Sequence, residues 1–87
     1  MKVLVDRLNG TLAIEVSSGP AVRTVTMSPD VTAALDRFGH LRVLTLLRPL
    51  EPGIRKTILP RLAAQFHVPA LAHMDPALFL EKVARHN

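Results

Sequence analysis

Residues 3–16, VLVDRLNGTLAIEV, decide the fold, because they place two alternating stretches on either side of a tight-turn dipeptide. Apolar residues recur at every second position over 12–16, the period at which side chains share one face of a strand. Val3 and Val5 begin a shorter stretch with the same spacing. The Asn-Gly pair at 9–10 tolerates the positive φ angles that a tight hairpin turn requires. The stretch therefore predicts a β-hairpin.

Further strands are expected after this hairpin, separated by residues that favour turns. Ser-Ser-Gly-Pro, Ser-Pro-Asp and Asp-Arg-Phe-Gly interrupt the chain at 17–20, 28–30 and 36–39. Between and after them, the extended segments are predicted at 21–27, 31–35 and 40–48. Connections this short are expected to join antiparallel neighbours. The sequence thus predicts an N-terminal antiparallel β-meander of four or five strands over 2–48.

Beyond Pro49 the spacing of apolar residues changes from two to about four. This spacing is typical of one face of a helix, and it is carried by Ile54, Ile58, Leu62 and Phe66. A proline is tolerated at the first position of a helix but breaks its interior. Pro60 therefore predicts a turn or loose helix at 53–58 and a regular helix from Pro60 to His67.

A second short helix is expected near the end of the sequence. Asp75 is a good N-cap, Pro76 suits the first helical position, and the helix is predicted to run toward His86. The fold class predicted is α+β, with the meander followed by two short C-terminal helices. We expect one domain over 1–87, made of the meander at 2–48 and a helical tail at 53–87.

The composition excludes several classes of protein. Among 87 residues there is no cysteine, so disulfides and thiolate metal sites are excluded. No apolar run approaches the roughly 18 residues of a membrane span, and the acidic Asp6 follows only a short apolar run, unlike a secretory leader. We expect a soluble cytoplasmic protein that does not bind membranes. The net charge of +4 is shared evenly along the chain, with no basic block typical of nucleic-acid binding.

No arrangement of polar residues predicts catalysis, a metal or a cofactor. The four histidines, at 40, 67, 73 and 86, lack the spacing of a zinc site. Asp6, Asp30 and Asp36 fall in predicted turns, where a carboxylate ordinarily binds the local backbone. No glycine pattern of a nucleotide-binding loop and no Gly-x-Ser-x-Gly motif is present. The sequence predicts a non-enzymatic protein with no metal and no cofactor.

One segment, LAAQFHVPAL at 62–71, is similar to the first helix and turn of a helix-turn-helix. The turn position that usually holds glycine is His67, and Pro76 falls where a recognition helix should continue. DNA binding through this segment stays open as an alternative. The other interpretation is a helical cap that packs on the sheet.

The N-terminal half resembles the DUF2283 family of small uncharacterised bacterial proteins. The resemblance covers residues 2–50 and is carried by Val-Asp at 5–6, Gly-Thr-Leu-Ala-Ile at 10–14, Ala-Val-Arg-Thr-Val at 21–25 and Asp-Arg-Phe-Gly-His-Leu at 36–41. It departs from the family at Val5 and Ala13, where members often have tyrosine. The resemblance implies an antiparallel meander and a possible small toxin-like partner, but it implies no activity.

The predicted last strand favours self-association. Its residues are apolar on both faces, so a second layer must cover each face, and the helical tail supplies only one. We therefore expect a protein-interaction domain that forms a homodimer. The alternative is an antitoxin-like regulator that binds a small toxin or operator DNA. The residues expected on the interaction surface are Arg23, Arg42, Leu44, Leu46, Arg55 and Arg61.

Overall fold

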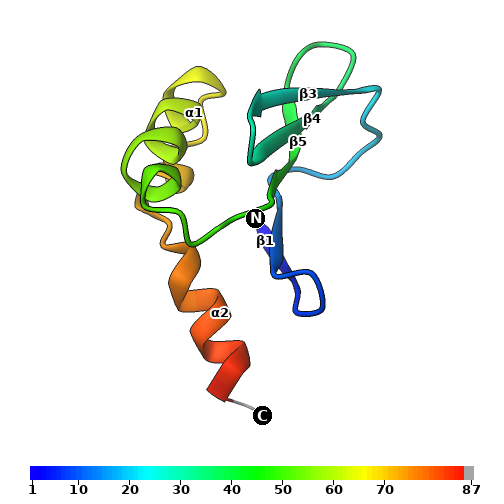
Figure 1. Cartoon of the computed structure of the whole chain (residues 1–87). Helices are drawn as coiled ribbons and strands as arrows, with labels where there is room; N and C mark the ends of the chain where they lie inside the picture. Colours follow the sequence, from blue (N-terminus) through cyan, green and yellow to red (C-terminus); the bar gives the residue numbers. More distant parts are fainter. Residues whose placement is uncertain (86–87) are drawn as a thin grey trace. The chain divides into compact units, whose positions relative to one another are not determined.

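The computed structural model describes residues 1–85, and the side chains of residues 1–80. It divides the chain into two compact units, Met1–Arg48 and Pro49–Asn87 (Figure 1). The division falls where the sequence changes from an alternating to a helical pattern. The first unit contains the strands and the second contains the helices.

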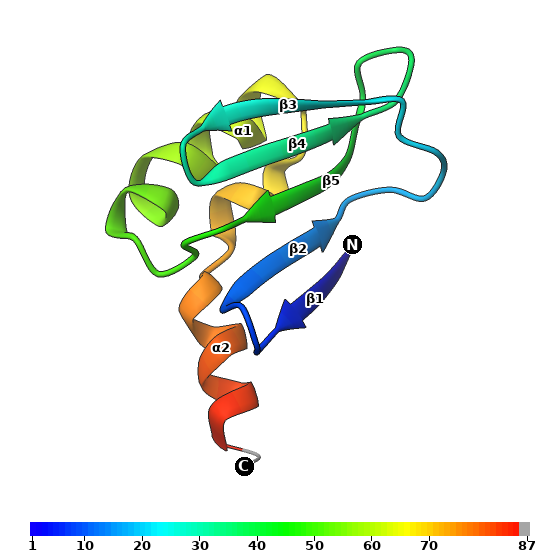
Figure 2. The same cartoon turned by 45° about the vertical axis from the view of Figure 1, so that its right-hand side comes forward.

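The first unit is a five-stranded antiparallel sheet with strand order β1-β2-β5-β4-β3. Figure 2 shows the strands side by side, with β1 and β3 at the two edges. The strands are β1 (Lys2–Asp6), β2 (Thr11–Glu15), β3 (Arg23–Ser28), β4 (Val31–Leu35) and β5 (Leu41–Leu46). Each of the predicted extended segments is present, and the predicted α+β class with an antiparallel sheet and C-terminal helices is confirmed.

The connection from β2 to β3 differs from the other three. The other three connections join strands that pair with each other: β1 with β2, β3 with β4, and β4 with β5. β2 pairs with β5 on its second side, so β5 lies between β2 and β4. The segment 16–22 therefore leads from β2 to the far edge of the sheet instead of to a neighbouring strand. The expectation that every short connection joins neighbours is wrong at this point. The reason is that β5, an apolar strand, occupies the middle of the sheet, where both of its sides are hydrogen-bonded.

The two faces of the sheet differ in the size and burial of their side chains. One face carries residues that are 0% exposed, including Leu12, Ile14, Val31 and Leu44. The register places a row of uncharged residues, all but the first of them alanine or threonine, on the opposite face from β1 to β3. The row is Leu4, Ala13, Thr45, Thr32 and Thr26. We call this second surface the open face.

The second unit begins with a helical run that changes its hydrogen bonding ahead of Pro60. A π-helical segment η1 (Ile54–Ile58) leads directly into α1 (Leu59–Gln65). The Leu59 N–H donates to the Ile54 carbonyl, five residues back. Because Pro60 has no N–H, the wider turn allows the chain to pass the proline without ending the helix. The sequence predicted two separate pieces at this position, and the structure joins them.

The remaining helices are a short 3-10 turn, η2 (Pro69–His73), and α2 (Pro76–Arg85). The predicted cap of α2 is confirmed, because the Ala77 N–H donates to the Asp75 carboxylate over 3.1 Å. His86, toward which this helix was predicted to run, lies outside the described residues. Within residues 1–85, no helix is both long and apolar enough to cross a membrane.

Candidate functional site

The structure divides the six residues expected on the interaction surface between surface and core. Arg23 is exposed on β3, whereas Leu44 and Leu46 are 0% exposed. Those two leucines belong to the core, so the expectation that they contribute to an interaction surface is wrong. The reason is that β5 lies in the middle of the sheet and directs both side chains to its buried face.

The other members of that set are arginines with different surroundings. Arg55 and Arg61 are both exposed in the second unit, on η1 and α1. The Arg55 guanidinium lies 3.6 Å from the Asp75 carboxylate. Arg42 is different, because its side chain is only 23% exposed and is held by a carboxylate. Arg42 therefore stabilises the first unit instead of presenting a free charge.

Asp36 organises the loop between β4 and β5. One of its carboxylate oxygens accepts the backbone N–H groups of Phe38 and His40, over 2.8 and 2.9 Å. The other carboxylate oxygen accepts a hydrogen bond from Nη2 of Arg42 over 3.0 Å and lies 3.3 Å from Nδ1 of His40. Burial raises the pKa of Asp36, but the two N–H donors and the nearby His40 and Arg42 side chains outweigh it and lower the pKa. The prediction that this carboxylate binds its local backbone is confirmed.

Arg42 extends this network to the connection between β2 and β3. Its Nη1 atom donates to Oγ of Ser17 over 2.9 Å and to the carbonyl of Ser18. The Ser17 hydroxyl in turn donates to the Leu41 carbonyl over 3.1 Å. A Cβ atom placed on Gly19 would lie 3.2 Å from the Arg42 guanidinium carbon, so the chain passes close to this side chain. The network fixes the long connection against β5 and has the geometry of a structural ion pair.

A hollow of about 410 Å³ lies beside this network in the first unit. Asp36 and Arg42 form part of its wall, together with Val22, Arg37 and Phe38. Phe38 is 71% exposed, and the Arg37 guanidinium lies 5.1 Å from the centre of its ring. Asp36 supplies the one carboxylate among the residues that line this hollow, and it is hydrogen-bonded to the backbone of the loop and to Arg42. His40, whose Nδ1 atom lies 3.3 Å from the Asp36 carboxylate, is not among the residues that line the hollow.

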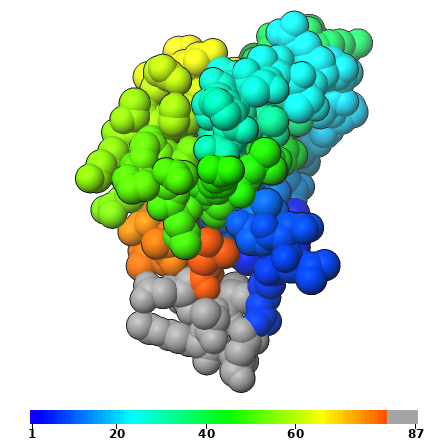
Figure 3. Space-filling model, viewed as in Figure 1, coloured from blue at the N-terminus to red at the C-terminus, as the bar shows by residue number. Residues whose placement is uncertain are grey.

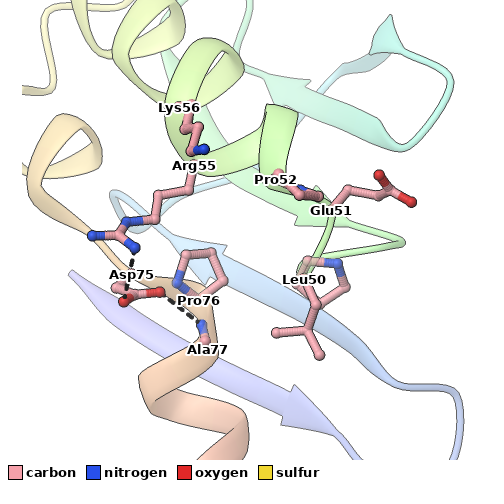
Figure 4. A pocket seen from close by; sticks show the side chains of 9 residues that line it. Leu50, Glu51, Pro52, Arg55, Lys56, Asp75, Pro76 and Ala77 are labelled. Carbon is pink, nitrogen blue, oxygen red and sulfur yellow. Dashed lines mark hydrogen bonds and ion pairs between the residues drawn. The ribbon is translucent and has the colours of Figure 1, made fainter.

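A second hollow, of about 300 Å³, lies in the second unit (Figure 4). Its charged residues are Glu51, Arg55, Lys56 and Asp75, and three prolines complete most of the wall. The Asp75 carboxylate accepts a hydrogen bond from the Ala77 N–H and forms an ion pair with Arg55, as the dashed lines in Figure 4 show. Among the side chains that the structure describes, no three histidine, cysteine or acidic residues form a group that could hold a metal ion.

The segment 62–71, which resembles the first helix and turn of a helix-turn-helix, has only part of that motif's structure. His67, two residues after the end of α1, adopts a positive φ of 57°, which is the conformation that glycine usually supplies at such a turn. The five residues of η2 follow, where a recognition helix of several turns would be needed to enter the major groove. This geometry gives no element for reading bases at 69–73.

The two edges of the sheet are the feature that sequence reasoning missed. Among the described residues 1–85, β1 pairs only with β2, so no strand of this part of the chain lies on its outer side. The strand has a continuous register with no bulge, and its central residue, Leu4, is 46% exposed. The turn that follows β1 is also open to solvent, since Leu8 is 94% exposed and the blue atoms of this turn reach the surface in Figure 3. The signal was present in the apolar centre of the sequence KVLVD at 2–6.

The opposite edge, β3, is built differently. Its register with β4 shifts between Thr26 and Ser28, which marks a bulge. The strand carries Arg23 at its start, and its exposed residues Thr24 and Thr26 are polar. Bulges and charged residues are the usual means by which sheet edges avoid pairing with other chains. By these criteria β3 is protected, whereas the centre of β1 is not.

Comparison of the chain with protein-family models, with curated proteins and with solved structures gives no match. The resemblance to the DUF2283 family therefore stays a prediction.

Proposed function

We propose that this chain is a non-enzymatic protein-interaction domain that associates with a second copy of itself through its sheet. The observation that carries the proposal is β1, an edge strand that is apolar at its centre, regular and unpaired on its outer side. The free N–H and C=O groups of such an edge can hydrogen-bond another strand. Leu4 adds an exposed apolar side chain at the middle of that edge.

The surroundings of β1 support a partner made of protein. The open face next to Leu4 continues into Ala13 on β2 and Thr45 on β5, neither of which carries a charge. A neutral surface of small and β-branched residues suits contact with another protein surface better than contact with phosphate groups. The one charged residue of β2, Glu15, lies opposite Lys2 of the same copy, so the surface beside Leu4 carries no charge that would oppose the approach of a second copy.

Sedimentation equilibrium over a range of about 1 to 500 μM tests the proposal, because that range covers the affinities typical of weak interfaces. We expect a monomer–dimer equilibrium. In the variant Leu4→Lys the dissociation constant should rise by at least about 10-fold, which corresponds to 1.4 kcal/mol. Leu8→Lys is the matched control, since Leu8 is exposed but lies outside the strand. A strict monomer throughout this range, or equal effects of the two substitutions, would contradict the proposal.

A second candidate function is an antitoxin-like regulator that binds a small toxin or operator DNA. It is favoured by the exposed cations Arg55, Lys56 and Arg61, which lie close in sequence on η1 and α1. Binding of duplex DNA that weakens steeply between 50 and 200 mM salt would support the DNA version. The absence of binding at 50 mM salt would remove it and leave an acidic protein as the partner of these cations.

A further inference from the structure

The charges at the two ends of β1 specify how a second copy would pair with it. Lys2 begins the strand and Asp6 ends it, and both are exposed on the open face together with Leu4. Two antiparallel copies related by a two-fold axis at Leu4 bring Lys2 of each copy opposite Asp6 of the other. Val3 of one copy then faces Val5 of the other on the opposite side of the sheet. The strand is thus complementary to its own reversed copy in charge and in apolarity.

We propose that two copies of this chain pair their β1 strands antiparallel about a two-fold axis at Leu4, which joins the two sheets into one of ten strands. This inference rests on the proposed function and names its interface. Five residues paired in this way form about four to six backbone hydrogen bonds between the copies. The two Leu4 side chains, each 46% exposed in a single copy, cover one another at the axis.

Other registers lose these matches. An axis at Val3 would set Lys2 against Leu4 and leave Asp6 beyond the paired region. An axis at Val5 would set Leu4 against Asp6, a leucine against a carboxylate. The axis at Leu4 is the register in which all five residues of β1 pair and every pair matches in character.

Asp6 has the hydrogen-bonding capacity for this role. Its Oδ1 and Oδ2 atoms each accept one hydrogen bond from Asn9, from the backbone N–H at 3.2 Å and the side-chain amide at 2.8 Å. An ionised carboxylate has about four acceptor sites, so each oxygen can accept a further donor. The bonds from Asn9 also fix the carboxylate at the end of the strand, where Lys2 of the second copy would reach it.

Single cysteines test the register directly, because the natural chain contains none. In the variant Leu4→Cys, the two introduced thiols lie on the axis, with Cβ atoms about 4.5–5.5 Å apart, close enough to form a disulfide with small adjustments. Lys2→Cys is the matched control on the same strand and face. Its thiols belong to residues offset by four positions, about 13 Å along the strand, which no disulfide spans.

Under mild oxidation we expect more than about 10-fold faster covalent dimer formation for Leu4→Cys than for Lys2→Cys, because only the first pair meets the distance limit of a disulfide. Equal rates, or faster cross-linking of Lys2→Cys, would overturn the register. If the natural chain is nevertheless a dimer in sedimentation, the proposed function stands and only this interface is wrong. A monomeric natural chain would overturn both.

Charge reversal gives an independent test that needs no disulfide. Lys2→Asp sets two acids opposite one another at both ends of the paired strands and should weaken the dimer by about 10-fold or more. Adding Asp6→Lys restores opposite charges and should return the dissociation constant to within about 3-fold of its natural value, the usual spread of such contributions. The double variant keeps an acid across from Glu15 on β2, so its recovery can come only from pairing between copies. Failure of the double variant to recover, while it stays folded, would refute the register.

Discussion

The two edge strands of the sheet, β1 and β3, differ in backbone regularity and in the side chains they carry. β3 carries a bulge, an arginine and exposed threonines, whereas β1 is regular, with an apolar centre and one charge of each sign at its ends. Both strands offer unpaired backbone groups on one side. The two edges differ in the backbone regularity and the side chains that accompany these groups. To pair with another chain, a strand also needs a straight backbone and side chains that match those of its partner.

The largest effect should separate the middle of the sheet from its edges. Leu44, on β5, is 0% exposed, so Leu44→Ala should lower the free energy of unfolding by about 2–5 kcal/mol. Leu4→Ala, on β1, should lower it by less than about 1 kcal/mol, because Leu4 is half exposed. Urea denaturation at a concentration below the dimer dissociation constant measures both values. Similar losses for the two variants would mean that β1 is as central to folding as β5.

An intermediate effect should distinguish the two edges from one another. Thr24 on β3 and Leu4 on β1 lie on the same face of the sheet, and both are exposed. A lysine at Leu4 should weaken association by at least about 10-fold, whereas Thr24→Lys should change it by less than about 2-fold, as for a surface position outside an interface. Light scattering across a concentration series reports both dissociation constants. The comparison between edges fails if Thr24→Lys is the more disruptive substitution.

The smallest effect should be a loss of stability in acid, caused by two aspartates: Asp6 in the turn after β1 and Asp36 in the turn before β5. The side chain and backbone N–H of Asn9 lower the pKa of Asp6, and the contacts of Asp36 lower its pKa, both from an ordinary value of 3.8. A carboxylate with a lowered pKa contributes stability above its unfolded value, and that contribution is lost as the pH falls through its folded value. Thermal unfolding should therefore occur at lower temperature below about pH 4.

The variants Asp6→Asn and Asp36→Asn should each reduce the drop in Tm between pH 7 and pH 2, by a few degrees at most for the exposed Asp6. Circular dichroism melts at the two pH values measure this difference. An unchanged drop in both variants would show that other carboxylates cause the acid sensitivity.

The strands and the cap of α2 could be predicted because each depends on residues close in sequence. The Asn-Gly turn at 9–10, the alternation over 12–16 and the Asp-Pro start of α2 act within a few positions of one another. The surface residues could not be predicted in the same way. Leu44 and Arg42 were expected on an interaction surface, but one is in the core and the other binds Asp36 and Ser17.

The α+β class, the positions of the strands and the self-complementary order of charges in β1 follow from side-chain period and residue type, so they can be read from the amino-acid sequence. The place of β5 between β2 and β4, and with it the edge position of β1, is visible only in the folded chain. The strand order depends on pairings between residues more than twenty positions apart, such as Ile14 with Leu44. No local pattern encodes such a pairing, since each strand has the same alternation whichever neighbour it joins.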